Sequence, residues 1–427
     1  LTALAFGLWP ALGSTRARPN EAIKVGGGHG ATAGSVGRAR RALVVAELAL
    51  TVMLLVGAGL MLRSMQQVVS QDTGLRADRV ATLELTMGGT RGGGAERLRV
   101  IYSTIERLAA TPRIEAVGAV NDLPLRAGGG LMAIGVTADG MPNPKSNEMR
   151  FARLLNASGG YFDALGIPIL SGRRFLASDD SLAPNVAIIN KTMADGLWPG
   201  VNPVGRTFHW GGDTAAITVV GIAADVREAG LEKAVSPQMY FPIDAHPPGN
   251  IAIVARGTLS EQALLARLTD AVRAVDRTQA VFNVRMMDDV VSTSVAPRRT
   301  NTVLIATFAA LALVLSALGV YAVVARGVAQ RSRELGIRSA LGASGRDLVT
   351  LVSGEMARVV ALGVLLGLGG AWALARLIAS LLYGVDVHDQ ATFVAVPLLL
   401  GVSAAAAVMI PALRAVRVSP TEVLRAD

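Results

Sequence analysis

The sequence VLIATFAALALVLSALGVYAVVARGVAQRSRELGIRSALGAS, Val303–Ser344, decides the fold. Its first 23 residues, Val303 to Ala325, carry no charged side chain. As a helix with a rise of about 1.5 Å per residue they span about 34 Å, which is enough to cross the hydrocarbon core of a bilayer. The residues that follow carry a basic excess, and such an excess beside a span predicts that this end faces the cytoplasm. The charged residues are Arg326, Arg331, Arg333, Arg338 and Arg346, against Glu334 and Asp347.

The overall composition also indicates an integral membrane protein. Of the 427 residues, 51% are hydrophobic and 17% are charged, and the apolar residues are grouped in blocks. The formal net charge is +9, but residues 63–300 contain 25 basic and 23 acidic side chains, so most of the excess flanks the apolar blocks. Membrane orientation explains this distribution better than nucleic-acid binding does, and we expect no nucleic-acid partner. Because the chain has no cysteine, an extracytoplasmic domain must rely on its core alone.

Four apolar blocks predict four membrane spans, and their basic flanks predict the topology. The first block follows Arg38, Arg40 and Arg41, so it runs from the inside to the outside. Residues 63–300 then lie outside, because the next span must return to the cytoplasmic end. The expected order is 42–62 for the first span, 63–300 for an extracytoplasmic domain with stalks, 301–325 for the second span, 326–350 for a cytoplasmic coupling helix, 351–376 for the third span, 377–390 for an outer loop, 391–413 for the fourth span and 414–427 for a cytoplasmic tail.

An internal repeat predicts a longer parent protein. Pro10–Lys24, PALGSTRARPNEAIK, aligns without gaps with Pro411–Arg425, PALRAVRVSPTEVLR, at a constant offset of 401. A period of this length indicates tandem duplication of a whole unit rather than a solenoid. Leu1 is not a start methionine, and residues 1–15 are uncharged and mostly apolar. We therefore expect residues 1–15 to be the end of the last span of a preceding repeat, and residues 16–41 to be a cytoplasmic linker.

The segment 63–300 has the mixed pattern of an α/β domain. Ser260 is a candidate N-cap for a helix whose Leu264, Leu265, Leu268 and Val272 share one face. Extended stretches are predicted at 81–85, 186–189, 217–222 and 251–255, and helices at 95–110 and 260–275. Residues 63–71 continue the first span as a stalk, and 288–294 begin a second stalk that we expect to be interrupted near Pro297.

Two features of the predicted spans are candidate sites. Glu47 is the one charge within the first span, so it is either a functional carboxylate or a side chain that reaches the membrane surface or pairs with Arg41. The third span carries Gly363, Gly367 and Ala371, and then Ala375, at every fourth position. Such a stripe of small residues predicts close helix packing, either within the unit or between units.

We expect no catalytic residue, bound cofactor or metal in this chain. The four histidines, at positions 29, 209, 246 and 388, show no zinc or protease spacing, and Gly26–Gly30 lacks the Lys-Ser/Thr of a phosphate loop. Asp179 with Asp180 and Asp288 with Asp289 are adjacent acids of the kind found on solvated faces, the first pair placed as at the start of a helix. Asp386, His388 and Asp389 in the last loop are more often solvated than metal ligands.

The segment Gln330–Leu341 carries the strongest signal. Arg331, Glu334 and Arg338 fall on one helical face with favourable pairings, while Ile337, Ala340 and Leu341 form an apolar face. Gly342 can end this helix, and Ser344 with Asp347 can cap the next one. Periodicity alone does not distinguish a helix resting on the membrane from one that binds a cytoplasmic partner.

Several motifs resemble those of one protein family. RSRELGIRSALGAS closely resembles the cytoplasmic segment of the MacB/FtsX-like permease family, whose members share the layout of one span, a large outer domain and three spans. The resemblance implies an α-helical membrane domain of four spans with a mixed α/β extracytoplasmic domain of the MacB periplasmic core type. The roughly 400-residue duplication most resembles the second half of a duplicated orphan permease of this family. The outer motifs are YFDALGIPILSGRRF (Tyr161–Phe175), LWPGVNPVGR (Leu197–Arg206), VVGIAADVR (Val219–Arg227) and QMYFPI (Gln238–Ile243).

By this resemblance the chain is a permease subunit without its own ATPase site, in a bacterial cytoplasmic membrane with both ends cytoplasmic. It passes motion driven by a partner ABC ATPase, which binds the ATP, to the outer domain, and exports or extracts a peptide, lipoprotein or amphipathic drug. Further implied partners are the other permease half or a second copy, the bilayer, and a periplasmic or outer-membrane protein. The alternative is a signalling protein that regulates a cell-envelope enzyme. The resemblance assigns the ATPase-coupling role to Arg331, Arg333, Glu334, Gly336, Ile337, Arg338 and Leu341.

Overall fold

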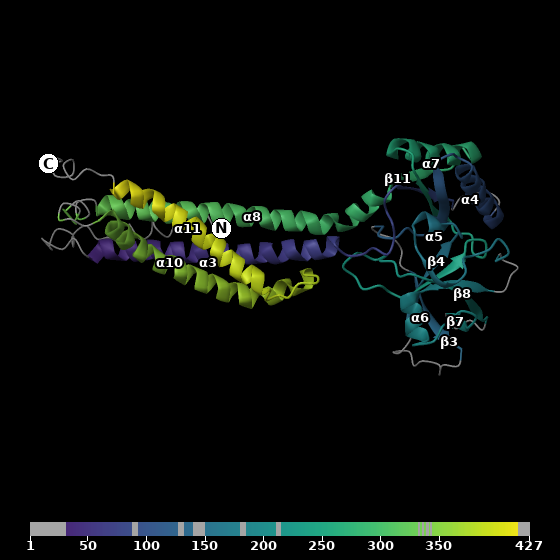
Figure 1. The fold of residues 1–427 in the computed structure, drawn as a ribbon, viewed down its shortest axis with the longest axis horizontal. Helices are drawn as coiled ribbons and strands as arrows, with labels where there is room; N and C mark the ends of the chain where they lie inside the picture. The colour runs from purple at the N-terminus through teal and green to yellow at the C-terminus, as the bar shows by residue number, and fades with distance from the viewer. Residues whose placement is uncertain are drawn as a thin grey trace, which may run out of the picture. The chain divides into compact units, whose positions relative to one another are not determined.

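The computed structural model divides the chain into two compact units (Figure 1). The helical unit comprises Leu1–Leu62 with Leu304–Asp427, and the α/β unit comprises Arg63–Val303. The structure describes residues 31–87, 93–126, 132–139, 150–179, 185–210, 215–331, 334, 337–338, 341 and 344–416.

The helical unit is built from four long helices that pack around one apolar core. They are α3 (Ala31–Val69), α8 (Met287–Gln330), α10 (Gly345–Ala375) and α11 (Gln390–Val416), with a short 3₁₀ helix, η1 (Arg376–Leu381), after α10. Among the described residues, four helices are long and apolar enough to cross a bilayer. The core contains Val52 and Leu60 of α3, Val320 of α8 and Leu400 of α11, and many other leucines of these helices are exposed. An apolar outer surface is what a helix bundle presents to lipid.

Helix α8 runs without a break through Pro297, so the expected interruption at this residue is wrong. Proline removes one backbone hydrogen bond, because it has no N–H to donate to the carbonyl of Thr293. The turn before it is reinforced by side chains: the hydroxyls of Ser292 and Thr293 donate to the carbonyl of Asp289, at 3.0 and 2.6 Å. Helix α3 continues to Val69, which confirms the predicted helical extension beyond residue 62.

The α/β unit contains one sheet of eleven strands, which forms two lobes. In the first, the sheet lobe, β11, β1, β10 and β2 pair in that order, all antiparallel, and α4 and α7 pack against them. Its apolar core includes Leu83, Ile101, Ile253 and Leu268. The bounds are β1 (Val80–Thr86), α4 (Gly93–Ala109), β2 (Ile114–Val120), β10 (Asn250–Gly257), α7 (Glu261–Val275) and β11 (Val281–Met286).

In the second, the ring lobe, six strands close on themselves, because β4 pairs with β3 on one side and with β9 on the other. The ring continues through β7, β8 and β6, and it encloses a core that includes Ile189, Phe208 and Met239. The bounds are β3 (Ala133–Ala138), β4 (Arg150–Ala157), α5 (Tyr161–Ala164), β5 (Ile169–Gly172), β6 (Val186–Asn190), α6 (Lys191–Leu197), β7 (Thr207–Trp210), β8 (Ile217–Ala223) and β9 (Gln238–Pro242).

The predicted segments of this unit are confirmed where a local pattern was visible. The four predicted extended stretches lie in β1, β6, β8 and β10, and the two predicted helices are α4 and α7. Ser260 is at the N-cap of α7, although its side chain makes no capping hydrogen bond. Leu264, Leu268 and Val272 are buried on the face of α7 that covers the sheet lobe.

The two lobes meet along a short seam where the end of β2 runs beside the end of β4. Val120 pairs with Ala157, and the flanking bonds are Asn121 N to Asn156 O at 3.0 Å and Ser158 N to Ala119 O at 2.9 Å. Helix α5 packs so closely on β2 that a Cβ at Gly118 would overlap the backbone nitrogen of Tyr161. Glycine at this position therefore permits the contact between the lobes.

Asp179 follows a turn, and its carboxylate accepts hydrogen bonds from Arg173 Nη1 at 2.6 Å, from Arg173 Nη2 at 2.9 Å and from the backbone nitrogen of Leu176. A helix that starts at Asp179 and Asp180 would lie in residues outside the described part of the chain, so that expectation stays a prediction. Bonding to Arg173 holds the pKa of Asp179 below its usual value. Asp180 lies outside the described residues.

Candidate functional site

The segment that joins α8 to α10 holds most of the residues singled out from the sequence. Glu334, Ile337 and Arg338 have helical backbone, and Arg338 Nη2 lies 2.7 Å from Glu334 Oε1 one turn earlier. Leu341 N donates to the carbonyl of Ile337 at 3.0 Å. Arg333 and Gly336 fall outside the described residues, as do Ala340 and Gly342.

Two apolar side chains of this segment are exposed. Ile337 and Leu341 are four residues apart and therefore share a helical face, and their exposed fractions are 48% and 83%. Beside them the Glu334–Arg338 ion pair supplies a charged edge. An apolar face with a charged edge is a surface suited either to a membrane interface or to a protein partner.

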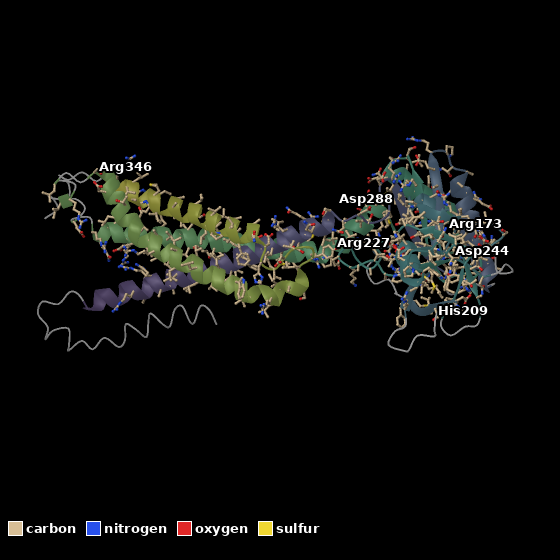
Figure 2. The ribbon with its side chains drawn as sticks, turned by 60° about the horizontal axis from the view of Figure 1, so that its bottom comes forward. Arg173, His209, Arg227, Asp244, Asp288 and Arg346 are labelled. Atoms are coloured by element: carbon tan, nitrogen blue, oxygen red, sulfur yellow. The ribbon has the colours of Figure 1, made fainter. Side chains whose placement is uncertain are left out.

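A capping box begins α10, as the sequence predicted. The Ser344 side chain accepts a hydrogen bond from Asp347 N at 3.3 Å, and Asp347 Oδ2 accepts from Ser344 N at 3.0 Å. The Ser344 hydroxyl also donates to Asp347 Oδ2 at 2.6 Å, and these bonds hold the pKa of Asp347 below its usual value. Figure 2 shows Arg346, in the first turn of α10, at the end of the helical unit.

Glu355 of α10 connects three helices at this end of the helical unit, and sequence reasoning missed it. Its Oε1 lies 3.4 Å from Arg331 Nη2, just past the end of α8, and its Oε2 lies 3.8 Å from Arg41 Nη2 of α3. The ion pair with Glu355 therefore ties Arg331, the residue that follows α8, to α10. The sequence signal was a lone carboxylate in the otherwise mostly apolar stretch VSGEMARVV, which periodicity does not connect with residues so far along the chain.

The stripe of small residues on α10 packs against α3 within the helical unit. A Cβ at Gly363 would come 2.6 Å from Leu48 Cβ, and one at Gly367 would come 2.6 Å from Val52 Cβ and 2.8 Å from the carbonyl oxygen of Ala49. Ala371, one turn further along the stripe, is buried in the same core. Close approach of helix backbones at small residues is the expected packing mode in membranes.

Glu47 faces α8 and does not pair with Arg41. A Cβ at Gly319 of α8 would come 2.8 Å from Glu47 Oε2, so the absence of a side chain there makes room for the carboxylate. The Thr51 hydroxyl donates to the carbonyl of Glu47 at 2.8 Å. Within the described part of the chain no ion pair reaches Glu47, and the expected pairing with Arg41 is wrong because Arg41 instead lies beside Glu355.

The remaining candidates have local structural partners. Asp389 Oδ2 accepts hydrogen bonds from the nitrogen and hydroxyl of Thr392 at the start of α11, and Asp386 Oδ1 accepts one from His388 N at 2.8 Å. Asp288 and Asp289 occupy the first turn of α8, where the helix dipole favours a negative charge. Among the described residues, no group of three or more His, Cys, Asp or Glu side chains is arranged to hold a metal ion.

Two family models together match most of the chain. Residues 42–285 match the MacB-like periplasmic core domain, and residues 306–420 match the FtsX-like permease C-terminal domain. The chain belongs to the MacB/FtsX-like permease family. The motifs that suggested this family in the sequence lie within these two matches, and the four long apolar helices agree with a multi-pass membrane permease.

The MacB/FtsX-like relatives include transporters from several bacteria. The macrolide export ATP-binding/permease protein MacB of Azoarcus sp. is 27% identical over 289 residues, which are 63% of this chain and 42% of that protein. MacB of Marinobacter nauticus is 24% identical over 369 residues, 82% of this chain and 54% of that protein. The ABC transporter permease YknZ of Bacillus subtilis is 24% identical over 340 residues, 75% of this chain and 82% of that protein. The chain thus spans about half the length of the MacB relatives it matches.

Solved structures of this MacB/FtsX-like family are also similar. The periplasmic region of MacB from Actinobacillus actinomycetemcomitans is 16% identical, with a TM-score of 0.36, covering 53% of this chain and 97% of that one. The extracellular domain of YknZ is 16% identical, with a TM-score of 0.31, covering 48% of this chain and 100% of that one.

Proposed function

We propose that this chain is the permease subunit of an ABC-type exporter in a bacterial cytoplasmic membrane. Motion driven by ATP in a separate cytoplasmic ATPase passes through the helical unit to the α/β unit, which acts on a substrate outside the membrane. The observation that carries this proposal is the pairing, in one chain, of a MacB-like periplasmic core with an FtsX-like permease domain. The ATP is bound by the partner, and this chain contributes no catalytic residue.

The helices that join the two units support a mechanical role. The chain passes from the helical unit to the α/β unit within α3 and returns within α8, so both connections are helical. At about 1.5 Å per residue, α3 with its 39 residues and α8 with its 44 are each roughly twice as long as a bilayer core is thick. The uninterrupted hydrogen-bonded backbone of α3 suits it to carry a displacement, whereas α8 lacks one such bond at Pro297.

The surface offered to the ATPase is the segment between α8 and α10. Exposed Ile337 and Leu341 supply apolar contact area, and the Glu334–Arg338 pair supplies charge at its edge. A compact apolar centre with a charged rim is typical of protein interfaces. The proposed contact residues are Arg331, Arg333, Glu334, Gly336, Ile337, Arg338 and Leu341.

The proposed substrate is a peptide, a lipoprotein or an amphipathic drug. Relatives of this chain are named for the export of macrolides and of pyoverdine. The described helices α3, α8, α10 and α11 offer few charged groups inside their apolar stretches, which is a poor lining for a hydrophilic path and favours action on the outer side. The further proposed partners are a second permease half or copy, as in a duplicated parent, and a periplasmic or outer-membrane protein.

The proposed orientation places residues 63–300 outside and both chain ends inside. Because the chain has no cysteine, single introduced thiols report this directly. In intact cells a membrane-impermeant maleimide should label Leu176→Cys, which is exposed in the α/β unit, and should label Leu341→Cys only after the membrane is opened. Labelling of Leu341→Cys in intact cells would overturn the orientation.

The coupling proposal is tested by charge reversal at Arg338. Efflux and substrate-stimulated ATP hydrolysis by the complex, purified with its ATPase, should both be lost in Arg338→Glu. The control is the double reversal Glu334→Arg with Arg338→Glu, which keeps an ion pair within the helix. Recovery in the double variant would show that Arg338 acts only within its helix, whereas continued loss supports contact with the ATPase. Unchanged efflux with lost activation of an envelope hydrolase would favour the signalling alternative instead.

A further inference from the structure

A cluster of buried charges lies in the seam between the sheet lobe and the ring lobe. Arg153 projects from β4, and its side chain is 6% exposed. Its Nη2 lies 2.6 Å from Oδ2 of Asp122, which follows β2, and its Nη1 forms an ion pair with Glu228, in the loop after β8. The guanidinium of Arg153 thus forms ion pairs with two carboxylates, which come from different lobes.

Among the residues that the structure describes, the charges of this cluster do not balance. Arg126 is the second cation; its Nη1 lies 2.9 Å from Glu84 Oε2 and 3.9 Å from Asp122 Oδ1. Two arginines therefore face the carboxylates of Glu84, Asp122 and Glu228. The Glu228 side chain is 1% exposed, so water contributes little to stabilising the surplus negative charge.

Several oxygen atoms of the cluster also lack a hydrogen-bond donor. Glu228 Oε1 and Asp122 Oδ1 are buried, and no donor reaches them within the described part of the chain. The hydroxyl of Tyr161 is buried without a partner there as well. A proton on Glu228 would both remove the surplus charge and turn an unpaired acceptor into a donor.

We propose that Glu228 is a proton-binding site of the α/β unit, and that its proton sets how firmly the loop after β8 is held to the seam. With Glu228 protonated, Arg153 and Asp122 form a balanced pair and the neutral carboxyl group stays buried in the seam. With Glu228 ionised, the surplus negative charge is buried, and this weakens the hold on the loop. The proposal does not depend on the transport function.

The groups that face Glu228 come from every element packed around it. They are Arg153 from β4, Asp122 after β2, Tyr161 from α5 and Tyr240 from β9. Burial raises the pKa values of both tyrosine hydroxyls well above the usual range, so neither tyrosine ionises in place of Glu228. Burial raises the pKa of Glu228 to about 7; Arg153 acts in the opposite direction, and Asp122 raises it further.

The loop that carries Glu228 is also bound to the chain that follows α3. Neighbouring Arg227 donates to the carbonyl of Lys233 at 2.6 Å and to Gln71 Oε1 at 3.0 Å, and its backbone nitrogen donates to the carbonyl of Thr73 at 3.0 Å. On the other side, the carbonyl of Glu228 accepts from Leu125 N at 3.0 Å. Figure 2 shows Arg227 on the same side of the α/β unit as Asp288, where α8 begins. Protonation of Glu228 therefore acts where the chain leaving α3 meets the seam.

The test is an infrared titration of the full-length protein in lipid nanodiscs from about pH 5 to about pH 9. A band from a buried protonated carboxyl group should disappear with a midpoint near neutral pH, be missing in Glu228→Gln and persist in the control Glu106→Gln, an exposed glutamate of α4. Hydrogen exchange at Leu125 and Arg227, corrected for the intrinsic rate, should show protection that falls as the pH rises over the same range, in the unsubstituted protein only.

A second variant keeps the proposal falsifiable if Glu228→Gln does not fold. In Asp122→Asn the neighbouring negative charge is removed, so the midpoint should fall by about one pH unit. A titrating band that survives Glu228→Gln, a midpoint that does not move in Asp122→Asn, or no protonated band at all would overturn the proposal. The last result would indicate that water molecules satisfy the unpaired oxygens.

Discussion

Gly367 of α10 lies directly against Val52 of α3, and a Cβ at Gly367 would come within 2.6 Å of Val52 Cβ. The contact includes backbone, because the same Cβ would come 2.8 Å from the carbonyl oxygen of Ala49. Backbone cannot move aside as a flexible side chain can. The spacing of α3 and α10 therefore depends on the missing side chain.

We expect Gly367→Ala to destabilise the helical unit by about 1–3 kcal/mol, the range typical of overpacked cores. Thermal unfolding in detergent, followed by helical circular dichroism, measures this. The matched control is Gly369→Ala on the same helix, where a Cβ would meet nothing within 4 Å and the change should be neutral or mildly stabilising. Equal effects of the two substitutions would contradict the packing of α10 on α3.

Glu355→Gln should leave stability nearly unchanged but loosen the segment after α8. Both ion pairs of Glu355 join side chains that are about half exposed, so each contributes less than about 1 kcal/mol. A spin label on Leu341→Cys, in a chain that has no other cysteine, should become more mobile when Glu355 is neutralised. Exchanging the partners, as Arg331→Glu with Glu355→Arg, should restore the original mobility. Unchanged mobility in Glu355→Gln would show that the ion pair does not position this segment.

Gly118→Ala should destabilise the α/β unit by at least about 2 kcal/mol, because the new methyl group would overlap the backbone nitrogen of Tyr161. Gly196→Ala in α6 is the control, since a Cβ there meets nothing within 4 Å. Thermal unfolding of the full chain, followed by tryptophan fluorescence, distinguishes the two variants. A stable Gly118→Ala protein would mean that α5 does not sit tightly on β2.

Arg256→Leu should cost about 3 kcal/mol of unfolding free energy. Its buried guanidinium donates to the carbonyl oxygens of Ala164, Asp78 and Arg76, at 3.0, 3.0 and 2.7 Å, and leucine would leave all three without this donor. Arg113→Leu, at an exposed arginine that donates to the carbonyl of Thr258, should cost less than about 1 kcal/mol. Denaturant titrations of both variants provide the measurement, and comparable losses would contradict the assigned role of Arg256.

Stability should fall as the pH rises through the range in which Glu228 ionises. The pKa of Glu228 is raised from 4.5 to about 7 by folding, so between these values the folded state binds more protons than the unfolded state. The contribution of Glu228 is therefore fully present below about pH 4.5 and is lost by about pH 7. The melting temperature of the unsubstituted protein, relative to Glu228→Gln, should decrease across this window. A constant difference would contradict the raised pKa.

The membrane helices and their caps could be predicted because their signals are local. An uncharged run such as Val303 to Ala325 is a sufficient signal for a spanning helix, and the pair Ser344 and Asp347 is enough for a capping box. The continuity of α8 through Pro297 could not be predicted, because it depends on whether the surrounding helix tolerates one lost hydrogen bond.

The buried cluster of the α/β unit was beyond sequence reasoning. Asp122, Arg153 and Glu228 are single charged residues in three separate segments, and each has the pattern of an ordinary surface residue. Only the pairing of β2 with β4 and the return of the loop after β8 bring them together. The same reason applies to Glu355, whose partners lie on α3 and just past the end of α8.

The proline in α8 has a mechanical consequence. The turn from Thr293 to Pro297 lacks one of the backbone hydrogen bonds that the other interior turns of a helix contain. Helices bend most readily at proline, so a force that bends or twists α8 deforms this turn first. The most easily deformed turn of α8 therefore lies within the α/β unit and precedes the uncharged stretch that begins at Val303.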